Sequence, residues 1–266
     1  MRLEISVLSK PGGRAMNEDA YGFWAGSGVC FCVVCDGAGG QGGGDVASKL
    51  AVQTTLAWFQ DEPRCSGQAI EAALAAANRA IMEHQGTESR LANMRATAVV
   101  LAVDSANRAA AWGHLGDSRL YCFRGHQVVA QTKDHSVVQN MVDAGYIRKE
   151  DLRTTKERSK LFAALGQVEN FEPAVARAEF ALADGDAFLL CTDGFWEYID
   201  EGEMEFALSA VSSAEEWLRR MEQRVVVRGG KGQDNYSALA VWCTDPDASG
   251  PQGPSPSAGT ATTVSL

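Results

Sequence analysis

The chain has 266 residues, 45% of them hydrophobic, which is enough to bury a substantial core within one compact domain. It carries 24 Lys and Arg against 34 Asp and Glu, a formal net charge of −10, and this acidic balance argues against general affinity for nucleic acid or anionic membranes. No apolar run approaches the ~20 residues of a membrane-spanning helix, and no secretory signal is visible, so we expect a cytoplasmic protein.

Apolar periodicity and turn residues predict the elements in chain order. Helices are expected at residues 45–59, 67–85, 136–144 and 213–229, with Ser66 and Ser213 as N-caps and Gly145 ending the third. Runs of strands joined by tight turns, with paired helices, favour antiparallel sheets covered by helices. The expected strands are residues 2–8, 29–35, 96–103, 108–115, 118–124, 127–132, 186–192 and 236–243.

Two strongly apolar strands each end in an Asp-Gly pair, Asp36-Gly37 and Asp193-Gly194. A carboxylate at the end of a buried strand is rigidly placed, and the following glycine lets a backbone carbonyl approach a cation. One Asp-Gly pair by itself usually marks only a turn. Together with three further acidic turns, however, these pairs indicate a shared site whose oxygen ligands suit Mg²⁺ or Mn²⁺ rather than zinc. The other turns are Asn17-Glu18-Asp19, Gly116-Asp117-Ser118 and Gln233-Asp234-Asn235.

These turns belong to a series of motifs through which the chain resembles the metal-dependent serine/threonine phosphatases of type 2C. The resemblance implies an α+β fold, a four-layer α/β/β/α sandwich in which two central antiparallel β-sheets are flanked by helices and the metal site lies between the sheets at one end. The motifs are Arg14-Ala-Met-Asn17-Glu18-Asp19-Ala20, Val34-Cys-Asp36-Gly37-Ala-Gly39-Gly40, Ala96-Thr97-Ala98, Gly116-Asp117-Ser118-Arg119, Asp134-His135-Ser136, Ala164-Leu165-Gly166, Cys191-Thr192-Asp193-Gly194 and Asp234-Asn235.

The resemblance also implies a role for each site residue. Asp36 would bridge two Mn²⁺ or Mg²⁺ ions, and the Gly37 carbonyl would bind one of them. Asp193 and Asp234 would complete one ion, while Glu18 would act through the water shell of the other. Asp19 would support the site nearby and Asp117 would serve a third, weaker ion. Arg14 would grip the substrate phosphate, because a guanidinium can pair with two of its oxygens.

The chain departs from many relatives at Ala38, where they carry a histidine that is a candidate general acid. Protonation of the leaving group would then come from metal-bound water or another side chain. His114 lies three residues before Asp117 but fits a hydrogen-bonded strand histidine better, and His135 is expected to brace a turn.

Three other interpretations can be weighed against this one. Gly37 to Gly42 satisfies G-x-G-x-x-G, but Asp36 would repel a pyrophosphate, and a second helix follows where a dinucleotide fold needs a strand. The seven cysteines lie mostly in apolar runs and suit buried side chains of a reduced protein better than a zinc site. The third alternative is a catalytically dead phosphatase fold that binds phosphoproteins, which would normally lack ligands that are present here.

The resemblance covers the chain up to about residue 243, so we expect a catalytic domain at residues 1–244 and a disordered Gly/Pro/Ser-rich tail at residues 245–266. Residues 146–160 are rich in basic side chains and are expected to form a mobile flap that helps choose substrates, with an ordinary solvated loop as the alternative. The implied partners are phosphorylated protein substrates, opposing a serine/threonine kinase, and the protein is expected to be a monomer.

Overall fold

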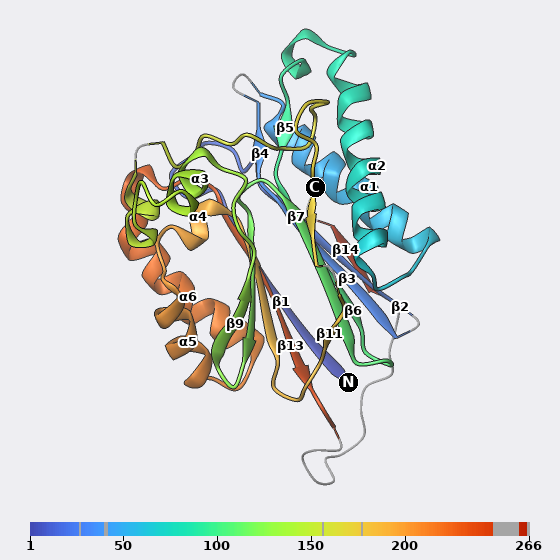
Figure 1. The fold of residues 1–266 in the computed structure, drawn as a ribbon, viewed down its shortest axis with the longest axis vertical. Helices are drawn as coiled ribbons and strands as arrows, with labels where there is room; N and C mark the ends of the chain where they lie inside the picture. The colour runs from blue at the N-terminus through green and yellow to red at the C-terminus, as the bar shows by residue number, and fades with distance from the viewer. Residues whose placement is uncertain (27, 40–41, 156, 177, 247–260, 265–266) are drawn as a thin grey trace.

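The computed structural model describes residues 1–26, 28–39, 42–155, 157–176, 178–246 and 261–264. Figure 1 shows two sheets at the centre of the molecule, with helices on the outer side of each. All neighbouring strands within the two sheets run antiparallel. The predicted α+β four-layer sandwich is therefore confirmed.

The first sheet has five strands in the order β1-β13-β12-β8-β9. It joins both ends of the domain, because β1 pairs with β13 along its whole length, from Arg2 opposite Thr244 to Lys10 opposite Tyr236. The β8–β9 turn has two successive residues of positive φ, Gly125 at 57° and His126 at 64°, as a type I′ hairpin turn requires. The strands are β1 (Arg2–Lys10), β8 (Arg119–Arg124), β9 (Gln127–Gln131), β12 (Ala187–Cys191) and β13 (Tyr236–Thr244).

The second sheet has the order β10-β7-β6-β3-β2-β14, with β11 also pairing with β7. The strand predicted at residues 96–103 is divided in two, because β5 (Arg95–Ala96) leaves this sheet to pair with β4 (Gly37–Ala38). The other strands are β2 (Ala20–Gly26), β3 (Val29–Cys35), β6 (Ala98–Asp104), β7 (Ala109–Leu115), β10 (Ala174–Val175), β11 (Phe180–Ala181) and β14 (Ala261–Val264).

Helices α1 (Gly44–Asp61) and α2 (Gly67–Gln85) pack on the second sheet, and α5 (Glu201–Ser209) and α6 (Ala214–Gly229) pack on the first. The predicted N-caps are confirmed, since Ser66 and Ser213 accept hydrogen bonds from backbone N–H groups in their first turns. The shorter helical segments are α3 (Val137–Asp143), α4 (Asp193–Trp196), η1 (Ser89–Leu91), η2 (Lys149–Thr154) and η3 (Gly230–Gly232).

Strand β3 shows why this sequence needs four layers. Its alternate residues Phe31, Val33 and Cys35 pack toward the helices, while Cys30, Cys32 and Val34 pack toward the other sheet. Both faces are thus covered, which explains an apolar run without polar alternation. The cysteines are free thiols, six of them buried and Cys65 half-buried, as expected for core residues.

Two elements and part of the tail differ from the expectations. Helices α4 and α5 fall in a stretch, residues 193–209, for which no helix was predicted. Of the tail expected to be disordered, residues 247–260 and 265–266 lie outside the described residues, and residues 261–264 form β14 beside β2. Within the described part of the chain, no helix combines the length and apolarity needed to cross a membrane.

Candidate metal centre

Seven of the eight predicted site residues line one cavity of about 370 Å³, located where β3 and β12 end. The cavity therefore collects side chains from segments more than 200 residues apart in the sequence. These seven residues are Arg14, Glu18, Asp36, Gly37, Asp117, Asp193 and Asp234. The eighth, Asp19, is buried.

Asp36 is fixed by a reciprocal contact with Thr97. Its N–H donates to the Thr97 hydroxyl at 3.0 Å, and its carbonyl accepts from the Thr97 N–H at 2.8 Å. The Thr97 hydroxyl also lies 2.6 Å from that of Ser118, the residue after Asp117. Thr97 thereby interrupts the predicted strand 96–103 and ties two of the acidic turns together.

Backbone segments approach unusually closely around Gly37. A Cβ at Gly37 would lie 2.0 Å from the Gly44 carbonyl oxygen and 2.6 Å from that of Glu18. A Cβ at Gly44 would lie 2.7 Å from Glu18 Oε1 and 2.8 Å from the Gly37 carbonyl oxygen. Two oxygens therefore face one small space that only glycine leaves open, which is the kind of cradle a cation can occupy.

Asn235, which the sequence motif contained but to which no role was given, links both ends of the chain. Its side-chain oxygen accepts from the Glu18 N–H at 2.8 Å. Its amide nitrogen donates to the carbonyls of Pro11 at 2.9 Å and Met16 at 2.8 Å. The oxygen and both N–H groups of this amide thus hold the Glu18 segment beside the Asp234 turn.

The carboxylates of the cavity are poorly compensated by protein cations. Burial, followed by repulsion from neighbouring carboxylates, raises the pKa of Asp193 to about 7 and that of Asp36 and Asp117 well above the usual range. Burial, and then Asp45 and Asp234, also raise the pKa of Glu18. Carboxyl groups with these pKa values attract any positive charge that can enter.

Asp19 is fully buried, and its carboxylate is also poorly compensated. The Thr192 hydroxyl donates to Oδ2 at 2.9 Å, whereas Oδ1 has no hydrogen-bond partner among the described residues. Burial raises the pKa of Asp19 to about 7 in spite of nearby hydroxyls. A buried carboxylate oxygen without a partner is costly unless a cation or water satisfies it.

The donor set of the cavity fits a hard divalent cation, because it consists of carboxylates and backbone carbonyls. Among the described residues, no group of three or more His, Cys, Asp or Glu side chains is arranged to hold an ion by itself. Ions here would accordingly complete their coordination with the Gly37 carbonyl and water, as Mg²⁺ and Mn²⁺ sites commonly do.

Arg14 lies at the mouth of the cavity, where its Nη2 is 2.8 Å from Asp234 Oδ2. Both side chains are about half exposed, so the pair is weakly held and screened by solvent. A guanidinium in this position can exchange Asp234 for an incoming anion.

The predicted flap is attached to the segment that follows Asp193. The Arg153 guanidinium donates to the carbonyls of Trp196 at 3.1 Å and Ile199 at 3.4 Å, and Arg158 donates to the Glu197 carboxylate. Just beyond Arg158, Ser159 and Leu161 line the cavity, and neither was predicted from the sequence. Lys156 of the same segment lies outside the described residues.

The two histidines lie away from the carboxylates. His114 Nε2 is 2.7 Å from the Lys133 carbonyl, and the ring lines a different cavity. His135 braces the Gly116 turn as predicted. Its ring Nδ1 accepts from the Gly116 N–H at 3.3 Å, and its backbone N–H donates to the Gly116 carbonyl at 2.9 Å. Ala38 lines the carboxylate cavity and offers no acid.

The comparisons with known proteins agree with this geometry. The sequence profile of the family described as protein phosphatase 2C matches residues 12–229. The serine/threonine protein phosphatase PstP of Mycobacterium tuberculosis is 33% identical over 235 residues, which are 88% of this chain and 43% of that protein. The serine/threonine phosphatase stp of Listeria monocytogenes is 30% identical over 214 residues, 79% of this chain and 82% of that protein.

A solved structure extends the similarity to three dimensions. The crystal structure of the PstP catalytic domain in complex with two manganese ions matches with a TM-score of 0.76 at 30% identity. The match covers 91% of this chain and 99% of that domain. The chain therefore corresponds to the catalytic domain of PstP and to less than half of the full-length protein.

Proposed function

The chain belongs to the protein phosphatase 2C family, and from this premise we propose that it is a metal-dependent protein serine/threonine phosphatase with its catalytic domain in residues 1–244. The observation that carries the proposal is the cavity in which four chain segments present Glu18, Asp36, Asp193 and Asp234 with raised pKa values for the first three. Cations that enter such an arrangement stabilise it.

We assign the ligands as the family resemblance implies. Asp36 would bridge two Mn²⁺ or Mg²⁺ ions, the Gly37 carbonyl would bind one of them, and Asp193 and Asp234 would complete one. Glu18 would act through water, Asp19 would hold the site from behind, and Asp117 would serve a third, weaker ion. When bound, the two ions supply an activated water and neutralise the charge of the phosphoryl group.

The remaining steps belong to side chains at the mouth of the cavity. Arg14 would leave Asp234 and pair with two phosphate oxygens, which orients the phosphorus toward the carboxylates. The Ser159 hydroxyl lines the same cavity and can donate to the substrate. Because Ala38 has no ionisable group, the leaving hydroxyl would take its proton from water.

A cysteine nucleophile does not fit this site. Cys35 immediately precedes Asp36, but burial, and then the charges of Asp19 and Asp36, raise the pKa of its thiol far above its ordinary value. A buried neutral thiol beside carboxylates is a poor nucleophile. The chain's own contribution is therefore positioning and electrostatics.

The substrates we propose are proteins phosphorylated on serine or threonine by an opposing kinase. The decisive measurement is release of phosphate from a phosphothreonine peptide by the metal-stripped protein, before and after addition of Mn²⁺, together with the affinity of the same peptide. We expect turnover only with Mn²⁺. Full turnover after exhaustive metal removal would refute the metal mechanism. Tight peptide binding without turnover at saturating Mn²⁺ would instead favour the catalytically dead binding module.

A further inference from the structure

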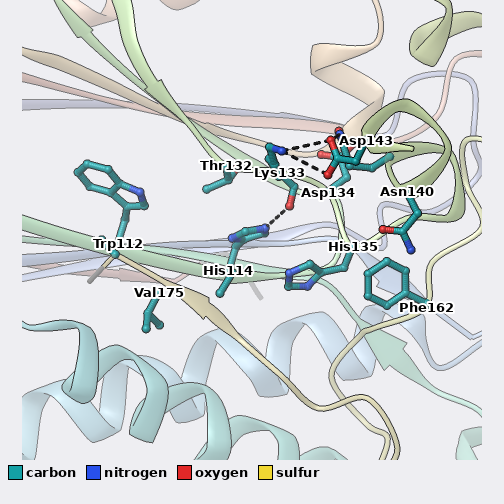
Figure 2. Close-up of a pocket in the computed structure, with 13 residues that line it drawn as sticks. Trp112, His114, Thr132, Lys133, Asp134, His135, Asn140, Asp143, Phe162 and Val175 are labelled. Carbon is teal, nitrogen blue, oxygen red and sulfur yellow. Dashed lines mark hydrogen bonds and ion pairs between the residues drawn. The ribbon is translucent and has the colours of Figure 1, made fainter. Parts of the chain in front are cut away.

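A second cavity of about 350 Å³ opens where the two sheets separate at the edge formed by β7 and β10. It shares no lining residue with the carboxylate cavity. Figure 2 shows Trp112 and Val175 near His114, with His135 next to His114 and Phe162 beyond it. Its volume is at the lower end of the ~300–1,000 Å³ typical of small-molecule sites.

Aromatic rings form the wall of this cavity. His114 stacks on His135 with ring centres 4.6 Å apart and planes 25° apart, and Phe162 follows at 5.7 Å from His135. Trp112 lines the cavity beyond His114. Phe162 leaves 38% of its surface exposed, although large apolar side chains are usually buried. Flat rings of this kind offer their faces to another planar group.

Each formal charge among the described residues that line the cavity is paired with an opposite charge. Lys133 Nζ lies 3.1 Å and 3.2 Å from the two oxygens of Asp143. Asp134 is held at both oxygens by Arg119 at 2.8 Å. Burial lowers the pKa of His114 and, together with His114, lowers that of His135 to about 4, so both rings are neutral near pH 7.

The His135 ring supplies a hydrogen-bond donor at the wall of this cavity. His135 Nδ1 accepts from the Gly116 N–H at 3.3 Å, so the proton of the neutral ring must sit on Nε2. Among the described residues, Nε2 has no hydrogen-bond partner, and the ring is half-buried at the cavity wall. A half-buried N–H beside aromatic faces recognises a hydrogen-bond acceptor at the edge of a ring.

We propose that this cavity is a second ligand site, separate from the carboxylates, for a free, uncharged, planar heteroaromatic molecule that stacks on the aromatic wall and accepts a hydrogen bond from His135 Nε2. The ligand would lie against the residue that holds Gly116, directly before Asp117. Binding of the ligand should consequently change the environment of both His135 and Gly116.

The test uses adenosine as the probe and the full chain labelled for NMR. We expect saturable shifts of the Trp112 indole, His135 and Gly116 signals with a dissociation constant on the order of 0.1–1 mM. Phe162→Leu should weaken binding by about tenfold. The matched variant Phe206→Leu, at an exposed position on α5, should leave it unchanged. His135→Phe keeps a ring but removes the donor, and it should weaken adenosine binding where His84→Phe on α2 does not.

The outcomes are decisive because binding is observed directly, without any assay of catalysis. Absence of saturable shifts in the wild-type protein, or equal affinity in Phe162→Leu and Phe206→Leu, would overturn the proposal. N-acetyltyrosinamide serves as a model of a protein side chain. If it competes as strongly as adenosine, the cavity receives aromatic side chains of a partner and the assignment to a free heteroaromatic molecule is wrong.

Discussion

Two groups of buried charges at the same end of the sandwich have opposite designs. The Arg119–Asp134 pair is almost fully enclosed, with two N···O distances of 2.8 Å, a third hydrogen bond to Tyr121 and the Trp196 ring 3.4 Å away. Among the described residues, the carboxylate cavity has no comparable partner, and Asp36, Asp117 and Asp193 in it have raised pKa values. The chain thus supplies the counter-charge where a charge is structural and leaves it to be supplied from outside where we propose chemistry.

The largest expected effect comes from removing the charge of one acid in the carboxylate cavity. Asp36→Asn should lower turnover of a phosphothreonine peptide by about a thousandfold or more, because the proposed bridging ligand is lost. The metal-free variant should nevertheless unfold at the same or higher urea concentration than wild type, since one repelling carboxylate is gone. Asp61→Asn, at the exposed end of α1, is the control for both measurements. Lower stability of the metal-free Asp36→Asn protein would contradict the contrast between the two groups.

Removing an acid from the buried Arg119–Asp134 pair should instead lower the stability of the protein. Asp134→Ala leaves the Arg119 guanidinium buried without its partner, and we expect the free energy of unfolding to fall by about 3–5 kcal/mol. Asp143→Ala breaks an exposed pair with Lys133 and should cost about 1 kcal/mol or less. Urea denaturation of the two variants measures this difference, and equal losses would show that the buried pair has no special role.

Arg14 is intermediate between the two cases, because it is a cation that the carboxylate cavity holds only loosely, through an exposed pair with Asp234. Arg14→Ala should raise the Michaelis constant for a phosphopeptide about 10- to 100-fold through loss of a charge-assisted contact. Arg14→Lys should recover only part of this, since lysine restores charge but not the two-pronged geometry. Arg90→Ala, in another exposed pair, should have no effect. If the Lys variant matches wild type, Arg14 does not bind phosphate through two bonds.

The smallest effect is a pH dependence of the metal-free protein. The pKa of Asp19 and Asp193 is about 7 in the folded state, above the ~3.8 of an unfolded chain, so the folded state binds more protons between these values. Stability should therefore rise, on the order of 1 kcal/mol, as pH falls from about 7.5 to about 6.5. Saturation with Mn²⁺ should abolish or reverse the trend, because bound cations keep the carboxylates ionised. A metal-free protein that loses stability over this range would contradict the assigned pKa directions.

Much of this architecture could be predicted from local sequence signals. Asp36 and Asp193 were found because each ends a long apolar run and precedes glycine, and the structure brings both into one cavity with the other acidic turns. The ends of α2 followed from Ser66 and the apolar face behind it. In each case a short stretch of chain contains the physical cause of the structure.

Other features depend on contacts that no short stretch contains. Helix α5 had a local signal that was overlooked, since Asp200 and Glu203 form a reciprocal capping box at its start. The division of residues 96–103 into β5 and β6, by contrast, follows from bonds between Thr97 and Asp36, 61 residues apart. The same holds for the flap arginines on the α4–α5 segment, whereas the mobility of the flap and its effect on substrate choice stay predictions.

Asn235 has a consequence for the order in which the molecule assembles. Because its amide joins Glu18, Pro11 and Met16 to the start of β13, the cavity cannot close until the end of the domain has been synthesised. Contacts separated by more than 200 residues form late in folding, after the entropy of a long loop has been lost. A nascent chain that stops before Asp234 would carry every other acidic turn and still lack a complete site, so we expect the protein to stay inert on the ribosome until β13 is in place.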